Sequence, residues 1–141
     1  MRLLRTITLS LLTELLKLED FELAICIVHA PEMAKINETF LQHSGSTDVI
    51  TFDYSDNPSS VLHGEIFICI DDALVQAREF RTSWQSEITR YVIHGILHLL
   101  GFDDLNPAAR RKMKREENRL LKKVSSLFPL RKLGGSPKLR A

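Results

Sequence analysis

The sequence contains few cysteines and no long apolar run, and each shortage excludes a class of protein. Its 141 residues include two cysteines, Cys26 and Cys69, which lack the paired C-x-x-C spacing of a structural zinc site. Both lie in apolar segments, so we expect free, buried thiols and no disulfide. No apolar stretch reaches the roughly 18 residues of a membrane-spanning helix, and the amino terminus has no cleavable apolar core. We therefore expect a cytoplasmic protein with no membrane partner.

The last quarter of the chain is nearly free of acidic residues, although the net charge of the whole chain is only +1. Residues 105–141 contain 12 Lys+Arg against 2 Asp+Glu, whereas residues 1–104 contain 7 against 16. A helix predicted from Pro107 to about residue 124 carries most of the basic side chains: Arg110, Arg111, Lys112, Lys114, Arg115, Arg119, Lys122 and Lys123. Such a stripe either follows a phosphate backbone or is a solvated face that balances the acidic body.

The most informative segment is His94-Gly-Ile-Leu-His98-Leu-Leu-Gly101-Phe-Asp-Asp104. Apolar residues recur at helical spacing between residues 86 and 100, at Ile88, Val92, Ile93, Ile96, Leu97 and Leu100. The two histidines therefore share one face of a predicted helix. Gly101 is suited to end that helix in a left-handed conformation, after which the chain can bring Asp104 back toward the histidines. We predict that His94, His98 and Asp104 bind one divalent metal and leave a coordination position open, as catalytic sites do.

A metal site with an open position is typical of hydrolytic enzymes. Two histidines at this spacing are weak evidence alone, and the prediction depends on the glycine and the carboxylates that follow them. The zinc peptidases carry a glutamate directly after the first histidine as general base, and this chain has Gly95 there. Peptide hydrolysis is therefore disfavoured. Asp103 is a candidate for proton transfer, but the sequence assigns no catalytic side chain.

The segment resembles the signature of the YbeY endoribonucleases, H-G-x-L-H-L-x-G-[YF]-D-H, at every position but the last. Upstream, residues 47–52 (TDVITF) are similar to the family's T-D-V-L-S-F strand, and residues 62–68 (LHGEIFI) to its L-G-D-I-x-I strand. Asn37 and Phe40 match the N-x-x-[YF] segment that precedes them. The resemblance thus runs from Asn37 to Asp104, with the motifs in the family's order and spacing.

Two positions depart from the family pattern. Asp104 stands where the signature usually has a third histidine ligand. A carboxylate in that place still suits zinc, the metal that we expect, but it makes manganese or iron more competitive. Leu41 follows Phe40 where the family commonly has an arginine thought to bind phosphate. His43 is a weaker candidate for the missing cation, because a histidine in a polar loop usually has no such role.

The resemblance implies a metal-dependent endoribonuclease, specific for single strands, that matures the 3′ end of small-subunit ribosomal RNA and takes part in ribosome quality control. The implied partners are single-stranded or ribosomal RNA and the ribosome or its proteins. Beside a phosphodiesterase site, the phosphate-binding interpretation of the basic helix is favoured. The alternative is a non-catalytic ribosome-assembly or RNA-binding factor with a structural metal, which the departures at Leu41 and Asp104 keep open.

The predicted fold is α+β: a small mixed β-sheet packed with helices and a zincin-like H-x-x-x-H helix, in one domain over residues 1–133. Helices are expected over 10–18, 31–43, 71–81 and 86–100, as well as from Pro107. Strands are expected over 22–28, 48–53 and 65–70. Residues 57–60 (NPSS) are predicted to form a loop near the mouth of the site, and residues 134–141 a disordered basic tail.

Overall fold

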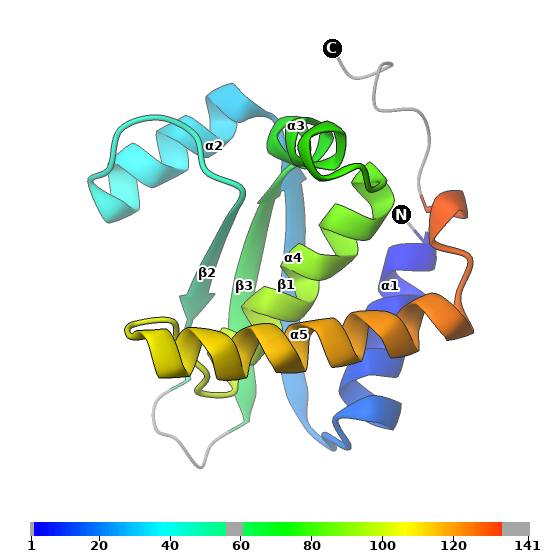
Figure 1. Ribbon diagram of the computed structural model, residues 1–141. Coiled ribbons are helices and arrows are strands. Elements are labelled where there is room, and N and C mark those ends of the chain that lie inside the picture. The colour runs from blue at the N-terminus through cyan, green and yellow to red at the C-terminus, as the bar shows by residue number, and fades with distance from the viewer. Residues whose placement is uncertain (1, 56–60, 134–141) are drawn as a thin grey trace.

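The computed structural model describes residues 2–55 and 61–133 and confirms the α+β class (Figure 1). The predicted loop at 57–60 and the predicted tail at 134–141 lie outside the described residues. In chain order the elements are α1 (Arg2–Ser10), the π-helical turn η1 (Leu11–Leu15), β1 (Phe21–Val28), α2 (Ala30–Ile36), the π-helical turn η2 (Asn37–Leu41), β2 (Val49–Asp53), β3 (Leu62–Cys69), α3 (Ile70–Phe80), α4 (Trp84–Leu99), α5 (Pro107–Leu127) and the 3-10 turn η3 (Leu130–Lys132).

The first helix begins earlier than the sequence suggested. We expected it over 10–18, whereas α1 starts at Arg2 and continues through η1 to Leu15. The reason is a buried stripe at helical spacing, formed by Leu4, Ile7, Leu11 and Leu12. Arg2 and Arg5 lie on the opposite, exposed side of the helix.

The three strands form one mixed sheet in the order β1-β3-β2. β3 is central, parallel to β1 and antiparallel to β2, with Ile25 opposite Ile66 and Thr51 opposite Ile66 on the other side. β3 begins at Leu62, three residues before the predicted start, because it pairs with the whole of β1 from Phe21 onward. β2 is therefore an edge strand, and its free edge is available to border a groove.

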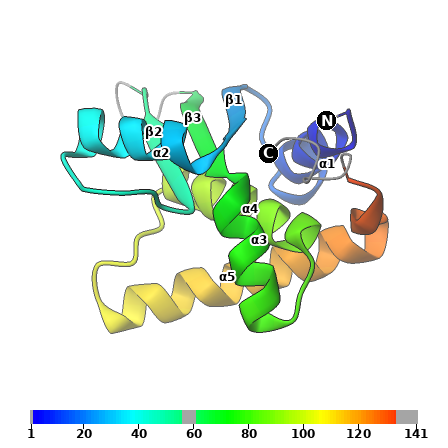
Figure 2. The same ribbon diagram turned by 90° about the horizontal axis from the view of Figure 1, so that it is seen from above.

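Helices cover the two faces of the sheet unequally (Figures 1 and 2). The larger core lies between the inner face of the sheet and helices α1, α4 and α5, and it includes Ile66, Ile88, Ile93, Leu97 and Val124. α2 covers part of the outer face, where Met33 packs with residues of all three strands. Within the described residues, none of the helices is both long and apolar enough to span a membrane.

Both cysteines are free thiols, but they differ in exposure. Cys69 is fully buried beneath α2, as expected. The expectation of burial is wrong for Cys26, which is half-buried. It lies on the outer face of β1, opposite Phe67, on the part of the sheet that α2 leaves partly open. Burial and the nearby Glu65 carboxylate both raise the pKa of the Cys26 thiol.

Helix α4 packs closely on the sheet at Gly95. A Cβ atom added there would lie 2.6 Å from Cδ1 of Ile66 and 3.0 Å from Oγ1 of Thr51. Ile66 is fully buried, so its side chain has no free space into which to move. The glycine between the histidines therefore has a packing role: it allows α4 to approach β2 and β3.

We expect Gly95→Ala to destabilise the fold by about 1–3 kcal/mol, because the added methyl group overpacks the interface between α4 and the sheet. Chemical denaturation monitored by circular dichroism measures the effect. Ser125→Ala, at an exposed position of α5, is the control and leaves the unfolding midpoint almost unchanged. An equally small effect at Gly95 would contradict the close approach.

Candidate metal centre

His94 and His98 lie one turn apart on α4 and turn the same ring nitrogen toward each other. Their Nε2 atoms are 3.1 Å apart, and the ring centroids are separated by 4.7 Å. Both side chains are partly exposed on a helix whose opposite face is buried in the core. The predicted helical face is thus confirmed, with both imidazoles at the surface of α4.

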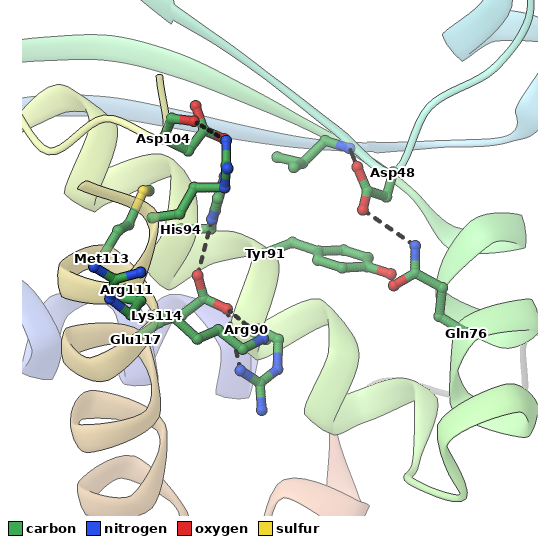
Figure 3. A pocket seen from close by; sticks show the side chains of 12 residues that line it. Asp48, Gln76, Arg90, Tyr91, His94, Asp104, Arg111, Met113, Lys114 and Glu117 are labelled. Atoms are coloured by element: carbon green, nitrogen blue, oxygen red, sulfur yellow. Dashed lines mark hydrogen bonds and ion pairs between the residues drawn. The ribbon is translucent and has the colours of Figure 1, made fainter. Parts of the chain in front are cut away.

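The other nitrogen of each ring has an acceptor that fixes the tautomer. His94 donates from Nδ1 to Oε2 of Glu117 on α5, at 2.8 Å (Figure 3). His98 donates from Nδ1 to the carbonyl oxygen of Phe102, at 3.1 Å. With both Nδ1 atoms protonated, both Nε2 atoms keep their lone pairs. Both Nε2 lone pairs are therefore free to bind one cation placed beside the pair.

The carbonyl that orients His98 is positioned by the end of α4. Gly101 has φ +101°, as predicted, and its N–H donates to the carbonyl oxygen of His98. The N–H of Phe102 donates to the carbonyl oxygen of Leu97, which completes a Schellman motif. The same turn that ends the helix thus holds the Phe102 carbonyl oxygen against the ring of His98.

Asp104 follows this turn and joins the two histidines. Its carboxylate and the two imidazoles place ligand atoms within 4.8 Å of one another. Asp104 is exposed, and its backbone carbonyl accepts a hydrogen bond from Nη1 of Arg110 at 3.2 Å. The structure therefore brings together all three residues predicted as ligands.

The donor set is chemically suited to a divalent transition metal. Two nitrogens bound tetrahedrally to zinc at 2.0–2.1 Å lie about 3.3 Å apart, close to the separation of the two Nε2 atoms. Two imidazoles and one carboxylate form a recurrent catalytic ligand set, and a carboxylate on the far nitrogen of a ligating histidine is the usual outer partner. The residues present thus fit a zinc-type ion.

The surroundings of His98 and Glu117 shift both pKa values in the direction that favours binding of a cation. Burial and the neighbouring His94 lower the pKa of His98, against an opposing effect of Asp104. His98 is therefore neutral, as a ligand must be, over a wider range of pH. Burial alone would raise the pKa of Glu117, but hydrogen bonds from His94 and Arg90 outweigh it and lower that pKa. Glu117 is thus a carboxylate at neutral pH.

Glu117 is the residue of this site that sequence reasoning missed. It is 5% exposed and also accepts a hydrogen bond from Nη1 of Arg90, at 3.1 Å. The available signal was its position, because it is an acid on the apolar side of a basic helix. The buried face of α5 consists of Met113, Glu117, Leu120, Leu121 and Val124.

The histidine pair lies where two cavities meet. The larger has a volume of about 520 Å³ and is bordered by the start of β2, by α4 and by the basic first half of α5. The smaller, of about 290 Å³, runs along β2 past Thr51 and Asp53 to Leu41. His94 and Val49 line both cavities. A groove between β2 and α5 therefore has the candidate ligands near its middle.

Three other positions singled out in the sequence have clear surroundings. Leu41 lines the smaller cavity together with both histidines, so the position of the family's arginine does face the site. His43 is exposed and lines neither cavity. Asp103 accepts the backbone N–H of Leu105 at 3.1 Å, which gives its carboxylate a role in the turn.

Comparison with known proteins gives one consistent result. A sequence model of the family described as Endoribonuclease YbeY matches residues 1–125. The Endoribonuclease YbeY of Salinibacter ruber is 33% identical over 72% of this chain and 69% of its own length. That of Bacteroides thetaiotaomicron is 37% identical over 71% of this chain and 72% of its own. The solution structure of TM1509 from Thermotoga maritima superposes with a TM-score of 0.70 at 25% identity, covering 96% of this chain and 90% of that one.

Proposed function

The chain belongs to the YbeY family of endoribonucleases, and on this basis we propose that it is a metal-dependent endoribonuclease that cleaves single-stranded ribosomal RNA. Within this proposal it acts in the cytoplasm on the 3′ end of small-subunit ribosomal RNA, contacts the ribosome or its proteins, and contributes to ribosome quality control. The observation that carries the proposal is the pair of facing Nε2 atoms, each held by a hydrogen bond at Nδ1, in a groove lined by cationic side chains.

His94, His98 and Asp104 would hold the metal, for which the donor set favours zinc. A metal bound there supplies a water that ionises near neutral pH and offsets negative charge on the phosphoryl oxygens. Glu117 keeps the Nδ1 proton on His94 and makes its Nε2 a stronger donor, and the Phe102 carbonyl does the same for His98. These two contacts orient both rings before any ligand arrives.

The first half of α5 provides the cations that would bind the RNA backbone. Arg110, Arg111 and Lys114 line the larger cavity beside His94, and all three are exposed. Arg111 forms no ion pair with any other residue of the described ranges, so it is available to a phosphate. At the opposite end of the groove Leu41 provides no charge. The backbone is therefore expected to bind mainly from the α5 side.

This asymmetry predicts the salt dependence of RNA binding. Arg111→Gln combined with Lys114→Gln should lower the slope of log K against log salt concentration by about 1.4, since each lost contact to a single strand contributes about 0.7. Fluorescence anisotropy with a labelled single-stranded RNA measures this slope. The matched control, Lys122→Gln with Lys123→Gln, removes the same charge from a part of α5 that lines neither cavity. Equal slopes for the two double variants would contradict a specific phosphate track.

A ribosome-assembly factor with a structural metal is the second candidate function. The uncharged Leu41 beside both histidines favours it, because a site without a cation there stabilises a developing phosphate charge less well. The two functions differ in one readout, the cleavage of single-stranded RNA by the purified protein with and without added zinc. Metal-dependent cleavage supports the endoribonuclease, whereas tight metal and RNA binding without cleavage supports the assembly factor.

A further inference from the structure

The larger cavity has a polar end that the proposed metal chemistry does not use. Asp48 and Gln76 form this end, on the far side of Tyr91 from His94 (Figure 3). Asp48 lies at the start of β2 and Gln76 on α3, so two elements remote in sequence meet here. Polar groups at the end of a cavity of about 520 Å³, a volume usual for small-ligand sites, point to recognition of a ligand.

The Asp48 carboxylate accepts three hydrogen bonds. Its Oδ1 accepts the backbone N–H of Val49 at 2.8 Å and the hydroxyl of Thr47 at 3.4 Å, and its Oδ2 accepts Nε2 of Gln76 at 3.1 Å. The Val49 contact is local and fixes the carboxylate at the beginning of the strand. The Gln76 contact comes from a flexible side chain, whose amide can be displaced by another N–H donor. The carboxylate of Asp48 is thus held by the backbone of Val49, and each of its oxygens also accepts from a side-chain donor that a ligand can replace, Thr47 at Oδ1 and Gln76 at Oδ2.

The hydroxyl group of Tyr91 is a second polar group at this end of the cavity that is open to a ligand. Its side chain is 4% exposed, lines the cavity, and points toward the Asp48–Gln76 pair (Figure 3). Its hydroxyl has no hydrogen-bond partner within the part of the chain that the structure describes. A buried polar group left unpaired costs about 1–3 kcal/mol. Rearrangement of Gln76 around a bound ligand could give this hydroxyl a partner.

The opposite wall of the cavity has the complementary chemistry. Arg111 and Lys114 on α5 present positive charge, and His94 connects this wall to the metal centre. One end therefore accepts N–H groups and the other attracts anions. A nucleotide has this polarity, with hydrogen-bond donors on the base and negative charge on the phosphate.

We propose that the Asp48 end of this cavity is a guanine-preferring nucleotide subsite of the RNA groove. Guanine is the only standard base with two adjacent N–H donors on its Watson–Crick edge, N1–H and N2–H, and a carboxylate offers two acceptors side by side. The base displaces the Gln76 amide from Oδ2 of Asp48 and the weakly bound Thr47 hydroxyl from Oδ1, while the phosphate lies toward Arg111 and Lys114. This inference rests on the proposed function, for which it supplies a base preference near the cleavage point.

The test is an NMR titration of the full chain with guanosine, inosine and adenosine 5′-monophosphates. We expect the guanosine nucleotide to bind about 5- to 150-fold more tightly than the adenosine nucleotide, the range for one bidentate base contact. Inosine monophosphate, which lacks the N2 amino group, should fall between them. The largest amide shifts should include Val49 and Gln76.

Two variants identify the group that reads the base. Asp48→Asn keeps an acceptor for the Val49 N–H but loses one carboxylate oxygen, and it should abolish the preference for guanosine over adenosine monophosphate. Gln76→Ala removes the competing amide and should retain the preference. Equal binding of the three nucleotides, no detectable binding, or an unchanged preference in Asp48→Asn would overturn the subsite.

The outcomes separate the subsite from the proposed function. Binding of free nucleotides requires no cleavage, so guanine preference in a protein that does not cut RNA would leave the subsite in place and remove the nuclease. Metal-dependent cleavage by a protein that binds the three nucleotides equally would support the nuclease and remove the guanine subsite.

Discussion

Replacing His98 with alanine should abolish stoichiometric metal binding and lower the rate of RNA cleavage by more than about 100-fold. Removal of a group that hydrogen-bonds to a metal ligand typically lowers metal affinity or activity by about 10- to 100-fold. Removal of the ligand itself should have a larger effect, which gives the lower bound. His98 donates to Phe102 and turns its Nε2 toward that of His94, so the variant leaves a single imidazole at the site. Inductively coupled plasma mass spectrometry and a single-turnover cleavage assay measure the two effects.

The chain offers a matched control for this substitution. His43→Ala removes the same side chain from an exposed loop position that lines neither cavity, and it should bind metal and cleave RNA as the wild type does. A comparable loss of cleavage in His43→Ala would assign this histidine a role that its position does not indicate. Full metal content in His98→Ala would remove His98 from the ligand set.

Replacing Glu117 with glutamine should weaken metal binding or cleavage by about 10- to 100-fold, although Glu117 is not a ligand. Glutamine keeps the shape of the side chain and can still accept from His94, but it carries no charge to strengthen Nε2 as a donor. It also removes the carboxylate partner of Arg90, so we expect destabilisation of about 1–3 kcal/mol. Zinc titration against a competing chelator and urea denaturation measure the two effects.

The pH dependence of stability distinguishes a charge effect from loss of packing. The pKa of Glu117 is lowered in the folded state, so its contribution is fully present above the ordinary value of 4.5 and is lost as the pH falls through the folded-state pKa. The stability difference between wild type and Glu117→Gln should therefore shrink below about pH 4.5. Glu116→Gln, which alters a surface pair with Arg119, is the control and should affect metal binding little. A constant deficit at all pH values would contradict a role for the charge.

The sequence predicted those parts of the site that depend on local periodicity. The apolar spacing placed both histidines on one face of a helix, and Gly101 adopts the positive φ that its position implied. The return of Asp104 also followed from the short connection after that glycine. These features involve residues within about three helical turns of one another, where backbone geometry restricts the possible arrangements.

Contacts between distant segments could not be predicted in the same way. Glu117 reaches His94 because α5 crosses α4, and no periodicity in the sequence specifies that crossing. Asp48 meets Gln76 because β2 runs antiparallel to β3 and α3 follows directly from β3. The early start of α1 differs from these contacts, because Leu4, Ile7, Leu11 and Leu12 have helical spacing in the sequence itself, and the expected range of 10–18 did not include the first half of that stripe.

The metal dependence of RNA cleavage is tested most directly by a zinc titration of chelator-treated, untagged protein, with metal content and cleavage of single-stranded RNA followed in the same samples. Cleavage should be absent without metal and should rise in proportion to bound zinc up to one equivalent per chain. The variant His98→Ala should neither bind zinc nor cleave RNA at any point of the titration. Cleavage by the metal-free protein, or saturation with zinc without cleavage, would contradict the metal-dependent endoribonuclease proposed here.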